Sequence, residues 1–220
     1  WVRQGTMSLG QIRHFISEME SHNAYIGRIR LVGGEPTNHP QFQDIVKLLY
    51  ECLVDTGHVG CLEVVTNGSH KERIIPVKAA LSRVRTSGPK SKELTHVANL
   101  AATPAELGYE GKMCNAPSHC GFSLNKYGYF PCSSGAGIAR LHSLMEHQRL
   151  TLPYPTAIGT WPHLQELCNL CYHGLRDEDK VRCGTAINEL NVPSPKAWAS
   201  LGPWLAGKPV EWPIYAGDAK

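Results

Sequence analysis

The chain has 220 residues, 42% of them apolar, which is enough to bury a core in one domain with an appendage or in two small domains. A formal charge of +3 arises from 22 basic and 19 acidic residues spread along the sequence. No stretch therefore forms the concentrated basic surface typical of a nucleic-acid-binding module. The sequence has neither an apolar run long enough to span a bilayer nor an export signal. We expect a globular, cytoplasmic protein with no membrane partner and no evident nucleic-acid partner.

Eight cysteines are many for this length. They could in principle form four disulfides, but that framework belongs to small secreted chains without a large core, so metal ligation is favoured. The chain opens at Trp1-Val2-Arg3 without an initiator methionine. We expect it to be a fragment.

The first 86 residues predict helices and strands in alternation. Ser8 and Gln11 have capping-box spacing, and apolar residues follow at helical intervals. In chain order we expect a helix over 8–22, a strand over 26–32, a helix from Pro40 to Leu53, a strand over 61–65, a short helix over 74–80 and a strand over 83–86. Such alternation implies right-handed crossovers and a parallel sheet, either open and doubly wound or part of a barrel. In both cases ligands gather at the carboxyl ends of the strands.

Gly33-Gly34-Glu35-Pro36 follows the first predicted strand. Two glycines let a ligand approach the backbone closely, because neither carries a Cβ. The Glu35 carboxylate and nearby carbonyls can accept hydrogen bonds from an ammonium group, and Pro36 stiffens the exit from the loop. Spacing alone fits equally well a tight strand-to-helix turn with an exposed glutamate.

Residues 29–40, with this motif at their centre, resemble the second strand and loop of radical S-adenosylmethionine (SAM) enzymes. In that family the motif's backbone receives the amino group of the SAM methionine. Val64-Val65-Thr66-Asn67-Gly68 is similar to the end of the family's third strand, whose Asn lies near SAM, and Ser87 matches a polar position on the fourth. The resemblance covers about residues 5–90 and implies a partial (β/α) barrel with parallel strands over 1–110. The SAM-binding residues that it implies are Gly33, Gly34, Glu35, Pro36, Asn67 and Ser87.

The family's defining C-x3-C-x2-C loop is absent. That loop holds a four-iron, four-sulfur (4Fe-4S) cluster whose open iron binds and reductively cleaves SAM. No two cysteines here have C-x3-C spacing, and none precedes Cys52. We expect the loop upstream of Trp1, in a longer protein, and no SAM cleavage by this chain alone. A natural pseudoenzyme is the alternative.

Six of the eight cysteines fall between Cys114 and Cys183, where glycines, prolines and aromatic residues replace regular apolar periodicity. Cys168 and Cys171 form a C-x2-C pair, and Cys120 and Cys132 form a second, wider pair. Four thiolates suit a tetrahedral zinc ion or a four-iron cluster equally well. Buried structural cysteines would explain one or two of these residues but fit a C-x2-C pair poorly.

His119-Cys120-Gly121 and the segment 124–132 resemble the C-terminal auxiliary-cluster domain of radical SAM enzymes (SPASM/twitch-like). In that domain a Cys precedes a hairpin, and a later C-x2-C completes the ligand set. The resemblance implies one auxiliary 4Fe-4S cluster, in a small irregular domain over 111–185. Its implied ligands are Cys120, Cys132, Cys168 and Cys171. Cys114 and Cys183 are either substitutes in that set or parts of a larger pattern.

Other residues are interpreted as structural. Cys52, on the apolar face of a helix, and Cys61, at the start of a strand, are expected in the core. His39 and His119 are expected at the surface or beside the sites, and the eleven histidines show no paired ligand spacing of the HExxH type. A Pro/Trp-rich tail over 186–220 is expected to pack on the core.

The resemblance implies an oxidoreductase, complete only with its missing loop. It would accept one electron from an external donor such as flavodoxin or ferredoxin and cleave SAM to methionine and a 5′-deoxyadenosyl radical. The radical would abstract hydrogen from a substrate, for which a peptide or protein is the first candidate. The hard chemistry belongs to the cofactors, and no catalytic residue is assigned to this chain. The alternative is a non-catalytic iron–sulfur or zinc protein that serves electron transfer or interaction.

Overall fold

The computed structural model describes residues 6–86, 102–114, 121–154, 161, 163–182, 196, 199 and 214–215. Ser87, Cys120 and Cys183 lie outside the described residues, as do His119 and most of the predicted tail. The chain divides into two compact units, the sheet unit (described residues 6–86) and the cysteine unit (described residues between 102 and 215). Residues 102–110, which the sequence assigned to the end of the barrel domain, belong to the cysteine unit.

The helices of the sheet unit begin where the sequence predicts. In α1 (Leu9–Ser21) the Ser8 hydroxyl accepts a hydrogen bond from Gln11 N and the Gln11 side chain accepts one from Ser8 N, so the predicted capping box is present. The second predicted helix is α2 (Phe42–Leu49), which continues into a π-helical turn, η2 (Tyr50–Val54).

The third predicted helix is a 3₁₀ segment, η4 (Ile75–Ala80), instead of an α-helix. Two further 3₁₀ turns, η1 (Pro36–Asn38) and η3 (Lys71–Arg73), lie in the loops that follow strands. Six residues leave room for few i→i+4 hydrogen bonds, so the tighter 3₁₀ winding is used in this short segment.

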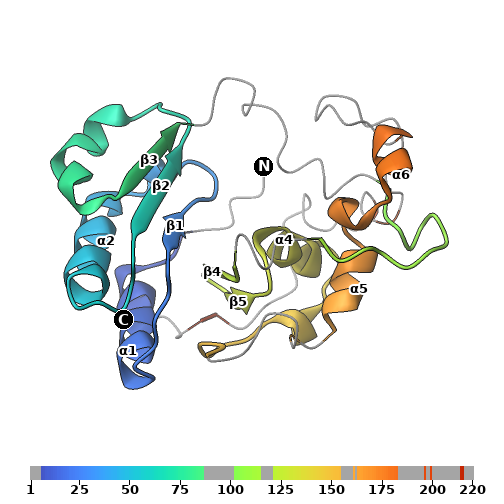
Figure 1. Ribbon diagram of the computed structural model, residues 1–220, viewed down its shortest axis with the longest axis horizontal. Helices are drawn as coiled ribbons and strands as arrows, with labels where there is room; N and C mark the ends of the chain where they lie inside the picture. Colours follow the sequence, from blue (N-terminus) through green and yellow to red (C-terminus); the bar gives the residue numbers. More distant parts are fainter. Residues whose placement is uncertain are drawn as a thin grey trace. The chain divides into compact units, whose positions relative to one another are not determined.

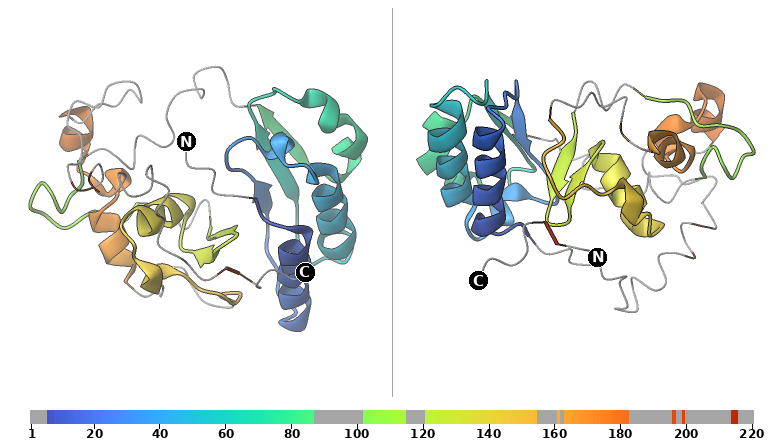
Figure 2. Two further views of the ribbon diagram at one scale, coloured as in Figure 1. Left: turned by 180° about the vertical axis from the view of Figure 1, so that it is seen from behind. Right: turned by 90° about the horizontal axis from the view of Figure 1, so that it is seen from below.

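The sheet is open, parallel and three-stranded in the described part of the chain. Its strands are β1 (Ile29–Leu31), β2 (Leu62–Thr66) and β3 (Arg83–Thr86), in the order β1-β2-β3. Helices α1 and α2 lie on the same face of this sheet (Figures 1 and 2). No barrel is closed within these residues, so the partial barrel stays a prediction. The three carboxyl ends share one edge, at which the loops after β1 and β2 meet.

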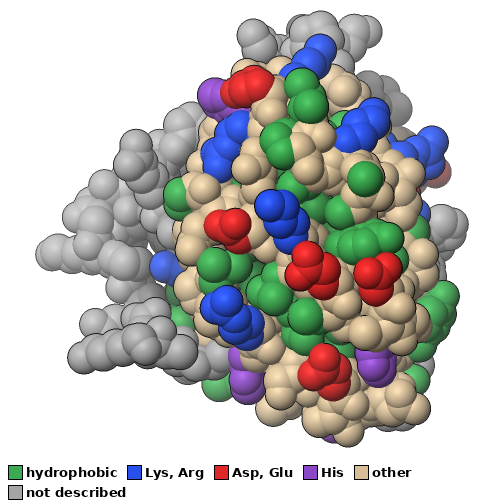
Figure 3. Space-filling view, turned by 90° about the vertical axis from the view of Figure 1, so that its left-hand side faces the viewer, with side chains coloured by type: hydrophobic (Ala, Val, Ile, Leu, Met, Phe, Trp, Pro, Cys, Tyr) green, Lys and Arg blue, Asp and Glu red, His purple; other side chains and the backbone are tan. Residues whose placement is uncertain are grey.

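The side of the sheet unit that carries the helices is mixed in character. Lys, Arg, Asp and Glu side chains are interspersed there with apolar ones, and neither charge dominates (Figure 3). None of the described helices combines the length and the apolar character that crossing a membrane requires.

The cysteine unit begins its regular structure with a hairpin, as the resemblance implies. Strands β4 (Ser123–Asn125) and β5 (Gly128–Phe130) pair antiparallel. Gly128 has a φ of 120°, and a Cβ there would collide with the carbonyl oxygen of Arg149, so only glycine fits this position. The helical segments that follow are α4 (Ser133–Leu141), η7 (Met145–His147), α5 (Leu164–Asn169), η9 (Tyr172–Gly174) and α6 (Asp177–Arg182).

The core of this unit joins the hairpin to α4 and α5. It is formed by Phe130, Ala136, Ile138, Ala139, Leu167, Leu170 and Cys171. From the predicted tail, Tyr215 is fully buried against the hairpin. Its N–H donates to the Lys126 carbonyl at 2.9 Å, and its hydroxyl lies 3.0 Å from that of Tyr129.

Candidate functional site

The loop after β1 leaves its backbone open to a ligand. Gly33 has a φ of 131°, which L side chains rarely adopt, and both Gly33 and Gly34 are exposed. A Cβ at either position would meet no atom within 4 Å. Within the described residues, neither glycine carbonyl accepts a hydrogen bond. The loop therefore presents two open acceptors at the carboxyl edge of the sheet.

Glu35 ties this loop to the end of β2. Its Oε1 accepts hydrogen bonds from Thr37 N at 3.1 Å, Thr37 Oγ1 at 2.6 Å and Thr66 Oγ1 at 2.7 Å. Its Oε2 accepts one from Asn67 N at 2.6 Å. Partial burial acts to raise the pKa of Glu35, but the hydrogen bonds from Thr37, Asn67 and Thr66 outweigh it and hold the pKa below its ordinary value. The carboxylate is thus ionised, and Oε2 keeps acceptor capacity for one more donor.

Neighbouring groups brace the same loop. Glu35 caps η1, which begins at Pro36. The Arg73 guanidinium donates to the carbonyls of Thr37 and, at 2.8 Å, Pro40. Asn67 makes a local turn in which its Oδ1 accepts from Ser69 N at 2.8 Å. Gly33, Gly34, Glu35 and Pro36, four of the six implied SAM-binding residues, are consecutive in the sequence. The fifth, Asn67, lies beside them, because its N–H donates to Glu35 Oε2. The sixth, Ser87, is outside the described residues.

A second group of polar residues, which was not predicted from the sequence, is a charge cluster on one face of the sheet, centred on Glu63. The Glu63 side chain is 7% exposed, and its Oε2 lies 3.1 Å from Arg30 Nε, 3.8 Å from Arg85 Nε and 4.0 Å from Arg28 Nε. Arg83 is the register partner of Glu63 on β3, so its side chain leaves the same face. Several guanidinium groups thus surround one carboxylate. The signal was the repeated Arg-x-Arg at 28–30 and 83–85, since alternate strand residues share a face.

Four of the six predicted metal ligands gather in the cysteine unit. Burial, with a smaller contribution from the nearby thiols of Cys114 and Cys132, raises the pKa of Cys168 to about 11 and that of Cys171 to about 12. Cys132 caps α4, and its Sγ accepts a hydrogen bond from Gly135 N at 3.1 Å. Backbone donors to sulfur and a helix N-terminus both favour a thiolate ligand.

The distances between the described thiols bear on the two metal centres that the sequence left open, a zinc ion and a four-iron cluster. Among the described residues, no three cysteine sulfurs lie within 4.8 Å of one another. A tetrahedral zinc ion with Zn–S bonds of about 2.3 Å needs sulfurs about 3.8 Å apart. A four-iron cluster spreads its ligands over separate iron atoms, so it needs a wider set. Cys120 and Cys183 lie outside the described residues, so both the zinc ion and the four-iron cluster stay predictions.

Three residues that the sequence analysis assigned no ligand role, Cys52, Cys61 and His39, lie outside both candidate sites or beside them. Cys52 and Cys61, which the sequence places in the core, are half-buried, and Cys61 Sγ donates to the Gly27 carbonyl at 3.6 Å. His39 Nε2 lies 2.8 Å from the Met7 carbonyl oxygen, which holds the chain before α1 against the loop after β1.

Comparisons with family models, with curated proteins and with solved structures each found no match to this chain. The assignment to a class of protein therefore depends on the motifs and on the geometry that surrounds them.

Proposed function

We propose that the sheet unit binds SAM at the carboxyl edge of its strands, as part of a radical SAM enzyme whose cysteine unit holds an auxiliary four-iron cluster. The observation that carries this proposal is the open Gly33-Gly34 backbone beside Glu35 Oε2 and Asn67. An ammonium group donates three hydrogen bonds. The two glycine carbonyls and Oε2 offer three acceptors, one of them charged, which suits the amino group of the SAM methionine.

The chain's own part in the reaction is to bind and orient SAM. In this family, SAM and the catalytic cluster, when bound, supply a one-electron cleavage that leads to hydrogen abstraction from a substrate. The cysteines of this chain lack the spacing that holds that cluster, so we assign binding to it and not cleavage. By the same resemblance we propose a peptide or protein substrate, an external donor such as flavodoxin or ferredoxin, and a cytoplasmic location.

A valine scan of two glycines tests the binding site. Gly34→Val should fold, because a Cβ there meets no atom within 4 Å, yet it adds a branched side chain to the loop that carries the open carbonyls. Gly27→Val is the matched control, since Gly27 is equally unobstructed but precedes β1, at the opposite edge of the sheet. We expect Gly34→Val to weaken SAM binding by at least about tenfold, or 1.4 kcal/mol, and Gly27→Val to leave it unchanged. Equal affinity in all three proteins would contradict the proposal.

The cysteines of the cysteine unit are also compatible with the alternative, a non-catalytic iron–sulfur or zinc protein, because they can bind a metal centre whether or not the sheet unit binds SAM. A chain that binds iron and sulfide but shows no SAM binding at millimolar concentration would support an electron-transfer or interaction protein. Zinc in place of iron would exclude the auxiliary cluster.

A further inference from the structure

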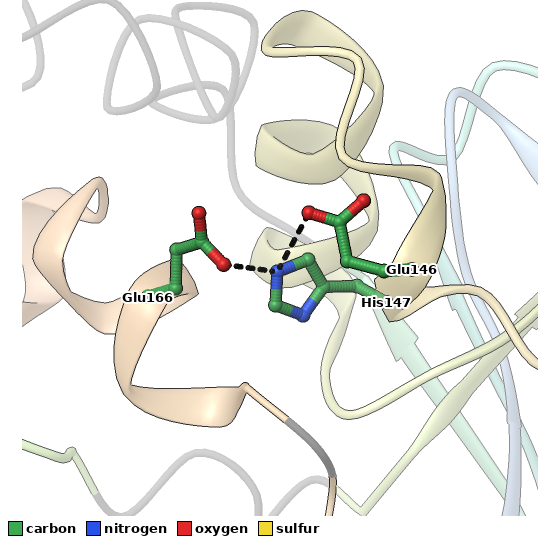
Figure 4. Close-up of side chains that lie close together, drawn as sticks. All are labelled: Glu146, His147 and Glu166. Carbon is green, nitrogen blue, oxygen red and sulfur yellow. Dashed lines mark ion pairs between the residues drawn. The ribbon is translucent and has the colours of Figure 1, made fainter.

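Three side chains that the proposed function does not use converge in the cysteine unit. Glu146 and His147 belong to η7, and Glu166 belongs to α5. His147 Nε2 lies 3.3 Å from Glu166 Oε2 and 4.0 Å from Glu146 Oε1, and the two carboxylates approach the ring from different elements (Figure 4). One potential ligand atom from each residue lies within 4.8 Å of the other two.

The imidazole is buried, and the contacts of its Nε2 with the two carboxylates lack the geometry of a normal hydrogen bond. The His147 side chain is 0% exposed, whereas those of Glu146 and Glu166 are 46% and 47% exposed. Neither ring nitrogen makes a hydrogen bond of normal geometry with the described residues. Buried polar atoms are nearly always satisfied, so an orphaned nitrogen that points between two carboxylates indicates a missing ligand.

The three side chains supply the ligand types of a metal site: one imidazole nitrogen and two carboxylates, at 3.3 Å and 4.0 Å from it. A neutral ring offers a nitrogen lone pair, and the two carboxylates bring two negative charges that a divalent cation would balance. Nitrogen and oxygen ligands of this kind suit Zn²⁺, Mn²⁺ or Fe²⁺.

We propose that Glu146, His147 and Glu166 bind one divalent metal ion that joins η7 to α5. His163 stands beside them, with its ring centroid 5.9 Å from that of His147 and a φ of 55° that is uncommon outside glycine. Water would complete the coordination.

The location suggests what the ion does. Helix α4, whose N-cap is Cys132, leads into η7, and α5 carries Cys168 in its last turn. An ion between η7 and α5 would hold together the two segments that present these cysteines. The site is therefore structural, and it does not depend on whether the sheet unit binds SAM.

Manganese titration of the full chain tests the site, followed by the paramagnetic resonance signal of free Mn²⁺. Mn²⁺ is the probe because thiolates prefer softer metals, so the cysteines compete little. We expect one bound ion per chain, with affinity reduced at least about tenfold in Glu166→Gln and in His147→Gln, since even supporting groups of metal sites contribute this much. Glu178→Gln, which alters an exposed carboxylate on α6, is the control and should bind as the unmodified chain does.

No saturable binding by the unmodified chain would overturn the proposal, as would unchanged binding in Glu166→Gln. Near-ultraviolet circular dichroism checks that each variant is folded. Because His147 is buried, its variant carries the larger risk of unfolding, and in that case the surface changes Glu146→Gln and Glu166→Gln decide the outcome.

Discussion

The Glu35 carboxylate should stabilise the sheet unit measurably, and Glu35→Gln tests this. The substitution keeps the size of the side chain but removes its charge. If the amide oxygen takes the place of Oε1, the donors of Thr37 and Thr66 meet a neutral acceptor, and Asn67 N–H faces an NH₂ group that cannot accept.

The expected loss is about 2–3 kcal/mol. Hydrogen bonds to charged groups contribute about 1.5–3 kcal/mol and neutral ones about 0.5–1.5 kcal/mol. One bond is lost here and three are weakened, but Glu35 is only half-buried, so water replaces part of what is lost. For a unit of this size the melting temperature should fall by about 10–20 °C.

Urea unfolding followed by circular dichroism measures the difference, with the exposed Glu51→Gln as a control that should change stability by less than about 0.5 kcal/mol. Because the folded pKa of Glu35 is lowered, its stabilisation is complete above the unfolded value of about 4.3 and is lost as the pH falls through the folded value. A stability gap below about 0.5 kcal/mol at pH 7, or one that persists unchanged in acid, would refute this role.

Three further predictions concern single residues. Glu63→Gln leaves Arg28, Arg30 and Arg85 without their shared carboxylate, so stability should fall by about 2–3 kcal/mol at low salt and by less at high salt; a salt-independent result would argue against charge as the cause. Gly33→Ala should cost about 1–2 kcal/mol in urea unfolding because of its positive φ, whereas Gly34→Ala should be nearly neutral, and equal costs would contradict the backbone geometry. Cys168→Ser should lower the iron bound per chain after anaerobic reconstitution while Cys52→Ser should not, and undiminished iron in Cys168→Ser would remove it from the ligand set.

The elements that follow from local signals were predictable. The apolar face and the capping box of α1 are formed by residues close together in the sequence, so the helix could be predicted. The alternation of helices with strands predicted the parallel pairing of the sheet, which the structure confirms. The 3₁₀ winding of η4 was not predicted, because the apolar spacing of a six-residue segment does not distinguish it from an α-helix.

The contacts that build the sites were not predictable from local patterns. Glu35 finds Thr66 and Asn67 at separations of 31 and 32 residues, through the parallel pairing of β1 and β2. Likewise Glu166 reaches His147 only because α5 folds back against η7. The glycine loop and the cysteine pairs are formed by near neighbours in the sequence and were therefore recognisable from spacing. The Glu63 cluster and the Glu146–His147–Glu166 group join residues from separate elements and were not recognised.

The most direct test of the proposed SAM site is to locate the residues that respond to SAM, by amide chemical-shift perturbation in the isotopically labelled chain. We predict that SAM at millimolar concentration shifts the amides of Gly33, Gly34, Glu35 and Asn67 and leaves those at the amino ends of the strands, such as Gly27 and Gly60, unchanged. Perturbations confined to other residues, or none at all, would contradict the proposed SAM site.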